Sequence, residues 1–315
     1  MAKIVYLLGA GASFGLRNQQ NIIEGLPIVS EIPQRLEYVI HELDNLDEPH
    51  LNHDNVAIDH MHKALLQDLT WLKNESANHA TIDTFAKKLW LTHKTEEYVK
   101  LKKLLAIYFI IEQVINIPDS RYDTFLANIL TPELTIPSEI SIITWNYDNQ
   151  FEIAYKVYSD ATYQLNMQNL KIFKLNGSAT FEGMEFQMSE ICGRETPHKL
   201  TQQLLKKLLK LYYIGKTNLS FAWENDTQFN NISQLAISVQ DANTLVVIGY
   251  TFPFFNRAID RKLMSYMRNL QTIYIQDPNA MQIRDNIIPV IPESLKTYKI
   301  ESKINVQQFY LPAEL

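Results

Sequence analysis

Short apolar runs alternate along the chain with segments whose apolar residues recur three and four positions apart. The runs have the β-branched and aromatic character of buried strands and lie at residues 3–8, 139–146, 171–175, 244–250 and 272–277. The helical segments lie at about residues 30–45, 147–157, 199–213 and 255–269. Strands that alternate with helices predict an α/β fold, with a Rossmann-like, doubly wound parallel sheet.

A long helical stretch interrupts this alternation at about residues 53–116. It contains neither Gly nor Pro, and its apolar residues keep helical spacing. We therefore expect a single domain over residues 1–315 that carries a helical insertion subdomain. In the shorter helix at 30–45, Ser30 is expected to be the N-cap.

Small or polar residues follow each predicted strand. They form the clusters Gly9-Ala10-Gly11-Ala12-Ser13, Asn146-Tyr147-Asp148, Asn176-Gly177-Ser178, Gly249-Tyr250-Thr251 and Gln276-Asp277. The carboxyl ends of parallel strands meet at one edge of a sheet, where open α/β sheets bind ligands. We therefore expect these clusters to converge on one crevice.

The glycine-rich segment after the first strand suits a diphosphate group. Gly9 and Gly11 allow a tight turn and a close approach to a ligand, and N–H groups at a following helix start attract anions. A second interpretation stays open on the residues alone. In that case the turn serves only the fold, Ser13, Asn146 and Asp148 cap helices, and Tyr250 belongs to the core.

Composition narrows the classes of partner and compartment. The chain has 35 acidic and 29 basic residues, a net charge of -6 and no Lys/Arg-rich block, so nucleic acid is not an expected partner. Its one cysteine, Cys192, excludes an internal disulfide and a multi-cysteine zinc site. With a single cysteine, we expect a cytoplasmic protein without a metal. We expect no membrane span, because no apolar run approaches eighteen residues.

Taken in order, the motifs resemble those of the sirtuin-like family, and more narrowly its bacterial branch found in anti-phage defence systems. The matching segments are GAGAS (9–13), GLP (25–27), TWNYD (144–148), KLNGS (174–178) and VIGYTF (247–252). TIDTFAKKL (81–89) also resembles a helix of that branch. The resemblance implies a Rossmann-like NAD site at which NAD is the substrate and is hydrolysed to nicotinamide and ADP-ribose.

The resemblance also implies roles for individual residues. Those implied to bind NAD are Gly9, Ala10, Gly11 and Ser13 at the diphosphate, Gly249, Tyr250 and Thr251 beside the adenosine, Gln276 or Asp277 at the adenine ribose, and also Gly177 and Ser178. Asn146 and Asp148 are implied to face the nicotinamide and its ribose. An amide that donates and accepts suits a carboxamide or a hydroxyl, and a carboxylate stabilises developing positive charge.

Two departures from the family limit what carries over. The single cysteine leaves no zinc module, so peptide deacetylation is not expected. Asn176 stands where the family motif has its catalytic His. An amide cannot take a proton at neutral pH, and loss of a general base typically costs about 10²- to 10⁴-fold in rate. The nearest alternative bases are His79 and His198.

Three hypotheses follow from Asn176. The chain is an NAD glycohydrolase in which Asn146, Asp148 and Asn176 are the catalytic residues, or a catalytically silent NAD-binding subunit, or a protein whose His has been replaced by engineering. An NADase that is always active would kill its host. We therefore expect an operon-encoded partner protein or a homo-oligomer to gate the activity, with the helical insertion as the contact surface.

Overall fold

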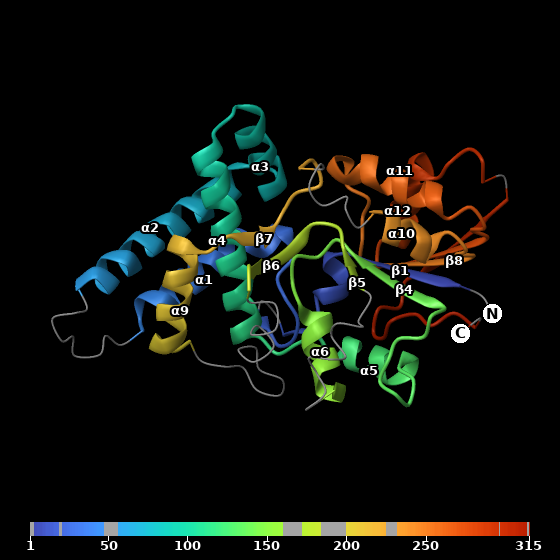
Figure 1. Ribbon diagram of the computed structural model, residues 1–315, viewed down its shortest axis with the longest axis horizontal. Helices are drawn as coiled ribbons and strands as arrows, with labels where there is room; N and C mark the ends of the chain where they lie inside the picture. The colour runs from blue at the N-terminus through green and yellow to red at the C-terminus, as the bar shows by residue number, and fades with distance from the viewer. Residues whose placement is uncertain are drawn as a thin grey trace.

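Six parallel strands form the central sheet of the computed structural model (Figure 1). The structure describes residues 3–18, 21–46, 56–159, 172–183, 200–224, 232–295, 297–313 and 315. The strands are β1 (Ile4–Leu8), β4 (Ile140–Thr144), β5 (Ile172–Lys174), β8 (Thr244–Ile248), β9 (Thr272–Gln276) and β10 (Lys299–Lys303). Their spatial order is β10-β9-β8-β1-β4-β5, which numbered along the chain is the 3-2-1-4-5-6 order of dinucleotide-binding folds. The predicted Rossmann-like α/β fold is confirmed.

Helices cover both faces of this sheet, as a doubly wound fold requires (Figure 1). On one face lie α10 (Ile232–Val239), α11 (Arg257–Tyr266) and α12 (Ala280–Ile287), and on the other lie α5 (Ser120–Ile129) and α6 (Gln150–Ser159). In β1, Val5 and Leu7 pack toward the first set, and Ile4 and Tyr6 toward the second. Burial on both faces explains why the central strands are apolar at every position rather than at alternate ones.

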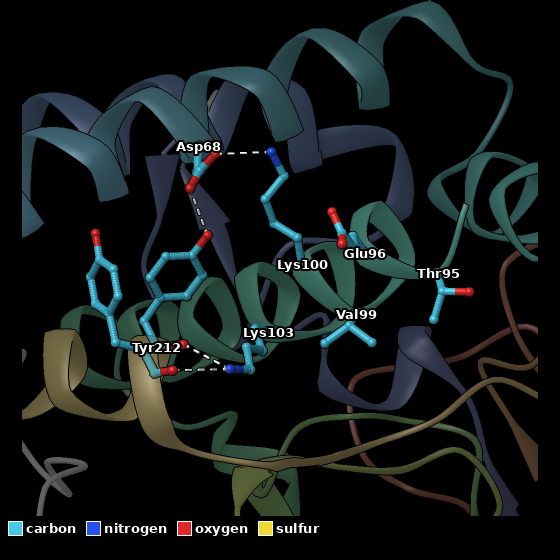
Figure 2. Close-up of a pocket in the computed structure, with 8 residues that line it drawn as sticks. Asp68, Thr95, Glu96, Val99, Lys100, Lys103 and Tyr212 are labelled. Carbon is cyan, nitrogen blue, oxygen red and sulfur yellow. Dashed lines mark hydrogen bonds and ion pairs between the residues drawn. The ribbon is translucent and has the colours of Figure 1, made fainter. Parts of the chain in front are cut away.

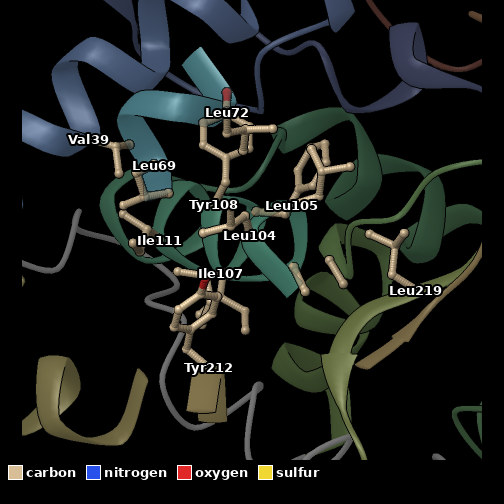
Figure 3. Close-up of a cluster of buried hydrophobic side chains, with 14 of the residues drawn as sticks. Val39, Leu69, Leu72, Leu104, Leu105, Ile107, Tyr108, Ile111, Tyr212 and Leu219 are labelled. Carbon is tan, nitrogen blue, oxygen red and sulfur yellow. The ribbon is translucent and has the colours of Figure 1, made fainter. Parts of the chain in front are cut away.

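A second hydrophobic core lies beside the sheet, in a lobe made mostly of helices (Figure 3). Its elements are α1 (Ile32–Asp44), α2 (Val56–Asn78), α3 (Ile82–Leu91), α4 (Thr95–Ile115), α9 (Gln202–Ile214), and the antiparallel pair β6 (Gly177–Phe181) and β7 (Thr217–Leu219). Helix α4 is its axis, because its residues are buried without interruption from Leu104 to Val114. We call these elements the helical subdomain.

Part of this subdomain falls in the stretch expected to be helical. Helices α2, α3 and α4 lie within residues 53–116, of which 53–55 are outside the described residues. Helices α1 and α9 come from chain segments on either side of that stretch, yet they pack on the same core. Leu36 and Leu43 of α1 and Leu208 of α9 are buried there. The subdomain is therefore larger than the predicted insertion.

Several short elements complete the described chain. They are the two-stranded pair β2 (Arg17–Asn18) and β3 (Asn21–Ile22) and the 3₁₀ segments Ala10–Ser13, Val29–Glu31, Phe254–Asn256 and Ile288–Val290. One of them overturns a prediction. Ser30 lies inside the 3₁₀ segment and is not the N-cap, because α1 begins only at Ile32, and Glu31 precedes it.

Two strands differ from the expectations. The segment around Ile172, expected to be a buried strand, is the edge strand β5 and is only half-buried. At the opposite edge, β10 was not anticipated, because its sequence KIESK has one apolar residue, as suits a strand with one neighbour and partial exposure to water.

The order of the strands creates a crevice at the carboxyl end of β1. From β1 the chain continues to β4 on one side, and β8 lies on the other, so this is the topological switch point of the sheet. The Gly11 N–H donates to the carbonyl of Gly249, which directly follows β8, over 3.0 Å. A Cβ added to Gly11 would lie 2.7 Å from the Gly249 Cα. Only bare backbone fits on both sides of this contact.

We predict that Gly249→Ala destabilises the protein by more than about 2 kcal/mol, because Gly249 has a positive φ of 59° and an added Cβ would lie 2.5 Å from the Ala12 nitrogen. Gly183→Ala is the matched control, since φ there is 77° but nothing lies within 4 Å of the added Cβ. The control should cost only about 1–2 kcal/mol. Denaturant unfolding measures both. Equal losses would contradict the claim that the crevice depends on close backbone packing.

Candidate functional site

A cavity of about 620 Å³ opens at the carboxyl ends of β1, β8 and β9. Its lining comes from Gly11, Phe14, Gly15, Leu16, Glu24, Ile28, Asp119, Ser120, Arg121, Ile248, Gly249, Gln276, Asp277, Pro278, Asn279, Val306 and Gln307. Its volume is within the roughly 300–1,000 Å³ of small-molecule sites. We call it the switch-point cavity. Of the residues predicted to bind NAD, Gly11, Gly249, Gln276 and Asp277 line it.

Behind the glycine turn (residues 9–13) lies a buried polar network. The Asn146 Nδ2 donates to the Gly9 carbonyl over 2.9 Å and to the Ser13 Oγ over 3.2 Å. The Ser13 hydroxyl donates to the Asp148 Oδ1 over 3.2 Å and lies 3.0 Å from the Tyr122 hydroxyl. The structure thus brings together Ser13, Asn146 and Asp148, which belong to two predicted motifs about 130 positions apart in the chain.

Asp148 has a capping role as well as a place in this network. Its Oδ1 accepts from the Gln150 N–H at the start of α6, over 3.0 Å. Burial raises the pKa of the Asp148 carboxyl, and the nearby Lys174 ammonium opposes that rise. Lys174 donates to the Asp148 carbonyl and forms an ion pair with Glu152 at 3.0 Å. The carboxyl is therefore a stronger base than an exposed Asp, yet a cation remains beside it to favour its ionised form.

Asn176 lies near the network without a hydrogen bond to Asn146 or Asp148. Its side chain follows β5, is 7% exposed, and donates from Nδ2 to the Trp145 carbonyl over 3.2 Å. Among the described residues its Oδ1 has no hydrogen-bond partner, although it is buried. An unsatisfied buried acceptor costs about 1–3 kcal/mol. This oxygen is therefore a candidate contact for a ligand.

The next two residues of that motif are structural in part. Gly177 begins β6 with a positive φ of 66°. The Ser178 hydroxyl donates to the Asn149 Oδ1 over 2.8 Å. Gly177 pairs with Leu219 of β7, Ser178 holds the chain beside Asn149, and neither residue lines the switch-point cavity.

Two residues assigned to the adenosine side lie elsewhere. Tyr250 is buried, stacks on Trp145 with ring centroids 5.7 Å apart, and donates to the Asp260 carboxylate over 2.9 Å. The Trp145 Nε1 donates to the same carboxylate over 3.2 Å. Tyr250 is thus a core residue, the alternative left open by the sequence, and Thr251 is exposed outside the cavity.

Gln276 is occupied by the C-terminal segment. Its Nε2 donates to the carbonyls of Asn305 and Gln308, each over 2.6 Å, and its Oε1 accepts from the Tyr310 N–H over 2.9 Å. Both ends of the amide are therefore used within the protein. Asp277 is half-exposed in the cavity, so it is the better candidate for a ribose hydroxyl.

Arg121 is a cavity residue that sequence motifs did not mark. Its guanidinium donates to the Gly11 carbonyl over 2.9 Å and to the Val306 carbonyl over 3.1 Å, and it forms an ion pair with Asp119 at 2.6 Å. It fastens the glycine turn to the start of α5 and to the C-terminal segment. A lone Arg outside any motif gave no signal, because these partners are far apart in sequence.

The other bases named from the sequence do not join the site. His79 directly follows α2, and its ring packs on Phe85 with centroids 4.6 Å apart and lies 2.9 Å from the Glu75 carbonyl. His198 and Cys192 lie outside the described residues. Within the described ranges, no group of three or more His, Cys, Asp or Glu side chains is arranged to hold a metal ion. No described helix is long and apolar enough to cross a membrane.

A second hollow of about 460 Å³ lies on the helical subdomain (Figure 2). There Asp68 of α2 accepts from Lys100 over 3.0 Å and from the Tyr212 hydroxyl over 2.7 Å. Lys103 donates to the Tyr212 carbonyl at the end of α9, over 3.0 Å. These groups satisfy one another and fasten α9 to α2 and α4. No residue predicted to bind NAD lines this hollow.

Comparison with known proteins adds no assignment. A scan against protein-family models found no match, and a search of curated proteins found none either. The case for a function therefore rests on the residues and contacts described above.

We predict that Asp260→Asn reduces the decline in stability between pH 5 and pH 8. Burial raises the pKa of Asp260 to about 7, so between about pH 4 and pH 7 the folded state holds a proton that the unfolded state has lost. The free energy of unfolding that this group contributes therefore falls as pH rises toward 7, by about 2–3 kcal/mol between pH 5 and pH 7. Urea unfolding at both pH values measures it. The exposed Asp285→Asn should keep the full wild-type decline, and a decline in Asp260→Asn as large as that of the wild type would refute the assignment.

Proposed function

We propose that the chain is a cytoplasmic NAD glycohydrolase, which cleaves NAD to nicotinamide and ADP-ribose as the effector subunit of a bacterial antiviral defence system. The observation that carries the proposal is the switch-point cavity beside the buried network of Ser13, Asn146 and Asp148. The resemblance of the ordered motifs to the sirtuin-like family supports the same substrate.

The adenosine diphosphate half of NAD fits the open part of this site. Asp277 supplies a carboxylate that can accept from ribose hydroxyls. Two N–H groups of the glycine turn are already used, since Gly11 donates to Gly249 and Ala12 donates to Gly9. We therefore assign the diphosphate contact to the backbone of Ala10, the exposed residue of the turn.

The nicotinamide half is assigned to the closed part of the site. Asn146 and Asp148 are each 8% exposed, and the unpartnered Oδ1 of Asn176 lies in the same region. In hydrolysis the bond from the ribose C1′ to the nicotinamide nitrogen breaks, its electron pair leaves with neutral nicotinamide, and C1′ becomes cationic. The Asp148 carboxylate and the Asn176 carbonyl oxygen supply the negative potential that this cation needs.

A catalytically silent NAD-binding subunit is the second candidate. Asn176 favours it, because an amide in place of a base cannot take a proton from a hydroxyl or from water. The two candidates share the same ligand and the same contacts. They differ only in whether nicotinamide is released.

Gating by a partner or by a homo-oligomer is part of the proposal. The helical subdomain exposes large apolar side chains, among them Trp90, Leu91, Val99 and Ile214. Such side chains suit a protein contact more than they suit contact with water. An operon-encoded partner protein that covers this surface is in a position to hold the enzyme inactive.

We predict that Asn176→His raises nicotinamide release, because it adds a group that takes a proton at neutral pH. The gain reaches about 10²- to 10⁴-fold when no other group of the site takes that proton, and it is smaller when one does. Chromatography of NAD incubations, with and without the operon partner, measures release, and calorimetry measures binding. Asn128→His is the matched control, since Asn128 is an exposed residue of α5. If neither the natural chain nor Asn176→His releases nicotinamide, NAD hydrolysis is rejected. Binding without turnover supports the silent subunit, and absence of binding refutes both candidates.

A further inference from the structure

The first turn of α3, in the helical subdomain, carries a carboxylate that is hydrogen-bonded to the segment between Asn146 and Asp148. Helix α3 begins after Thr81, whose hydroxyl accepts from the Thr84 N–H over 3.1 Å. Asp83 follows in that first turn, and its Oδ1 accepts from the Tyr147 hydroxyl over 3.4 Å. Tyr147 stands between Asn146 and Asp148 in the chain. Asp83 is thus bonded to the middle residue of the segment that carries two of the proposed site residues.

Asn176 is attached to the same segment. Its Nδ2 donates to the Trp145 carbonyl over 3.2 Å, and its own carbonyl accepts from the Ser220 N–H over 3.0 Å. The neighbouring Phe221 ring lies 6.2 Å from the Tyr147 ring. Asp83 and Asn176 are therefore both hydrogen-bonded to one short stretch, residues 145–147, and neither lines the switch-point cavity.

The environment of Asp83 suits a proton acceptor. Burial raises the pKa of Asp83 to about 6, and the Tyr147 hydroxyl opposes that rise. At neutral pH the group is mostly ionised, yet it is a stronger base than an ordinary Asp. Among the described residues it forms no ion pair, and its side chain is only half-buried, so solvent reaches it.

Other ionisable groups surround this pair. Glu224 forms an ion pair with Lys102 at 2.9 Å. Glu224 and Tyr98 both raise the pKa of the Tyr147 hydroxyl. Asp83 also raises the pKa of Tyr250, whose hydroxyl donates to Asp260. One turn along α3, Lys87 lies 5.0 Å from the Trp223 ring. Asp83 is therefore the acceptor of the Tyr147 hydroxyl, whereas Glu224 is paired with Lys102 and Asp260 is bonded to Tyr250.

We propose that Asp83 is the general base of the NAD hydrolysis proposed above, in the role that Asn176 cannot perform. The inference rests on that proposed function. The C1′–nitrogen bond breaks, and its electron pair leaves with nicotinamide. Water then adds to C1′, and one of its protons passes to the Asp83 carboxylate, which releases it to solvent. NAD⁺ and water thus give nicotinamide, ADP-ribose and one proton. Tyr147 is a positioning residue that orients the carboxylate.

This assignment explains how gating can reach the chemistry. The base stands on α3 of the helical subdomain, whereas Asn146 and Asp148 follow a strand of the sheet. A partner or a second copy that shifts α3 would separate the base from the bound ribose. Turnover would then stop without any change in the switch-point cavity.

The test compares Asp83→Asn with the natural protein under the conditions in which that protein releases nicotinamide. We expect turnover to fall by about 10²- to 10⁴-fold, with NAD binding by calorimetry unchanged. The rise of turnover with pH near 6, where Asp83 ionises, should disappear. Asp123→Asn is the matched control, because Asp123 lies in the first turn of α5 and accepts from the Tyr158 hydroxyl over 2.7 Å, but is exposed.

Two further variants separate a base from a structural residue. Adding Asn176→His to Asp83→Asn should restore turnover, since an imidazole then takes the proton. Tyr147→Phe should move the pH rise to higher pH, because the hydroxyl lowers the pKa of Asp83. It keeps the test decisive if Asp83→Asn does not fold.

Each outcome of these assays has a stated meaning. Turnover by Asp83→Asn equal to that of Asp123→Asn overturns the inference, and so does loss of NAD binding together with turnover. An unchanged pH rise in Tyr147→Phe also overturns it. If neither the natural chain nor Asn176→His releases nicotinamide, the proposed function itself fails, and the base assignment fails with it.

Discussion

The backbone contact between the glycine turn and the residue after β8 determines the geometry of the whole crevice. Gly11 donates to the Gly249 carbonyl over 3.0 Å, and neither residue has room for a side chain. Arg121 adds side-chain bonds from the same turn to the C-terminal segment. Because β4 and β8 flank β1, this contact fixes both the open cavity on one side and the buried polar network on the other.

Three carboxyl groups of the described residues are wholly or partly removed from water and bonded to neighbouring side chains or backbone. Burial raises the pKa values of Asp83, Asp148 and Asp260. Asp260 is held by Tyr250 and a Trp, so its role is to support the core. Asp148 belongs to the segment 145–148, and Asp83 is bonded to Tyr147 of that segment. Acids with shifted pKa values are expected at catalytic sites. In the proposed reaction, the division of these groups between the sheet and the helical subdomain would connect the chemistry to the proposed partner surface.

The sequence predicted the features that depend on local pattern. Central strands are recognisable because both faces are buried, whereas β10 was missed because an edge strand has few apolar positions. The position of Gln276 at a strand end was correct, but its amide is used by carbonyls about 30 residues later in the chain, at Asn305 and Gln308. Pairings of that kind, like the hydrogen bond from Tyr147 to Asp83, arise from tertiary packing and leave no local signal.

Hydrogen exchange of the natural protein with and without NAD tests the central claim most directly, because it locates the ligand whether or not turnover occurs. The account predicts that NAD slows amide exchange in the glycine turn at residues 9–13, at Gly249 and at residues 276–279, with added protection at residues 81–85 of α3. Protection confined to the hollow between α2, α4 and α9, or no protection anywhere at saturating NAD, would contradict it.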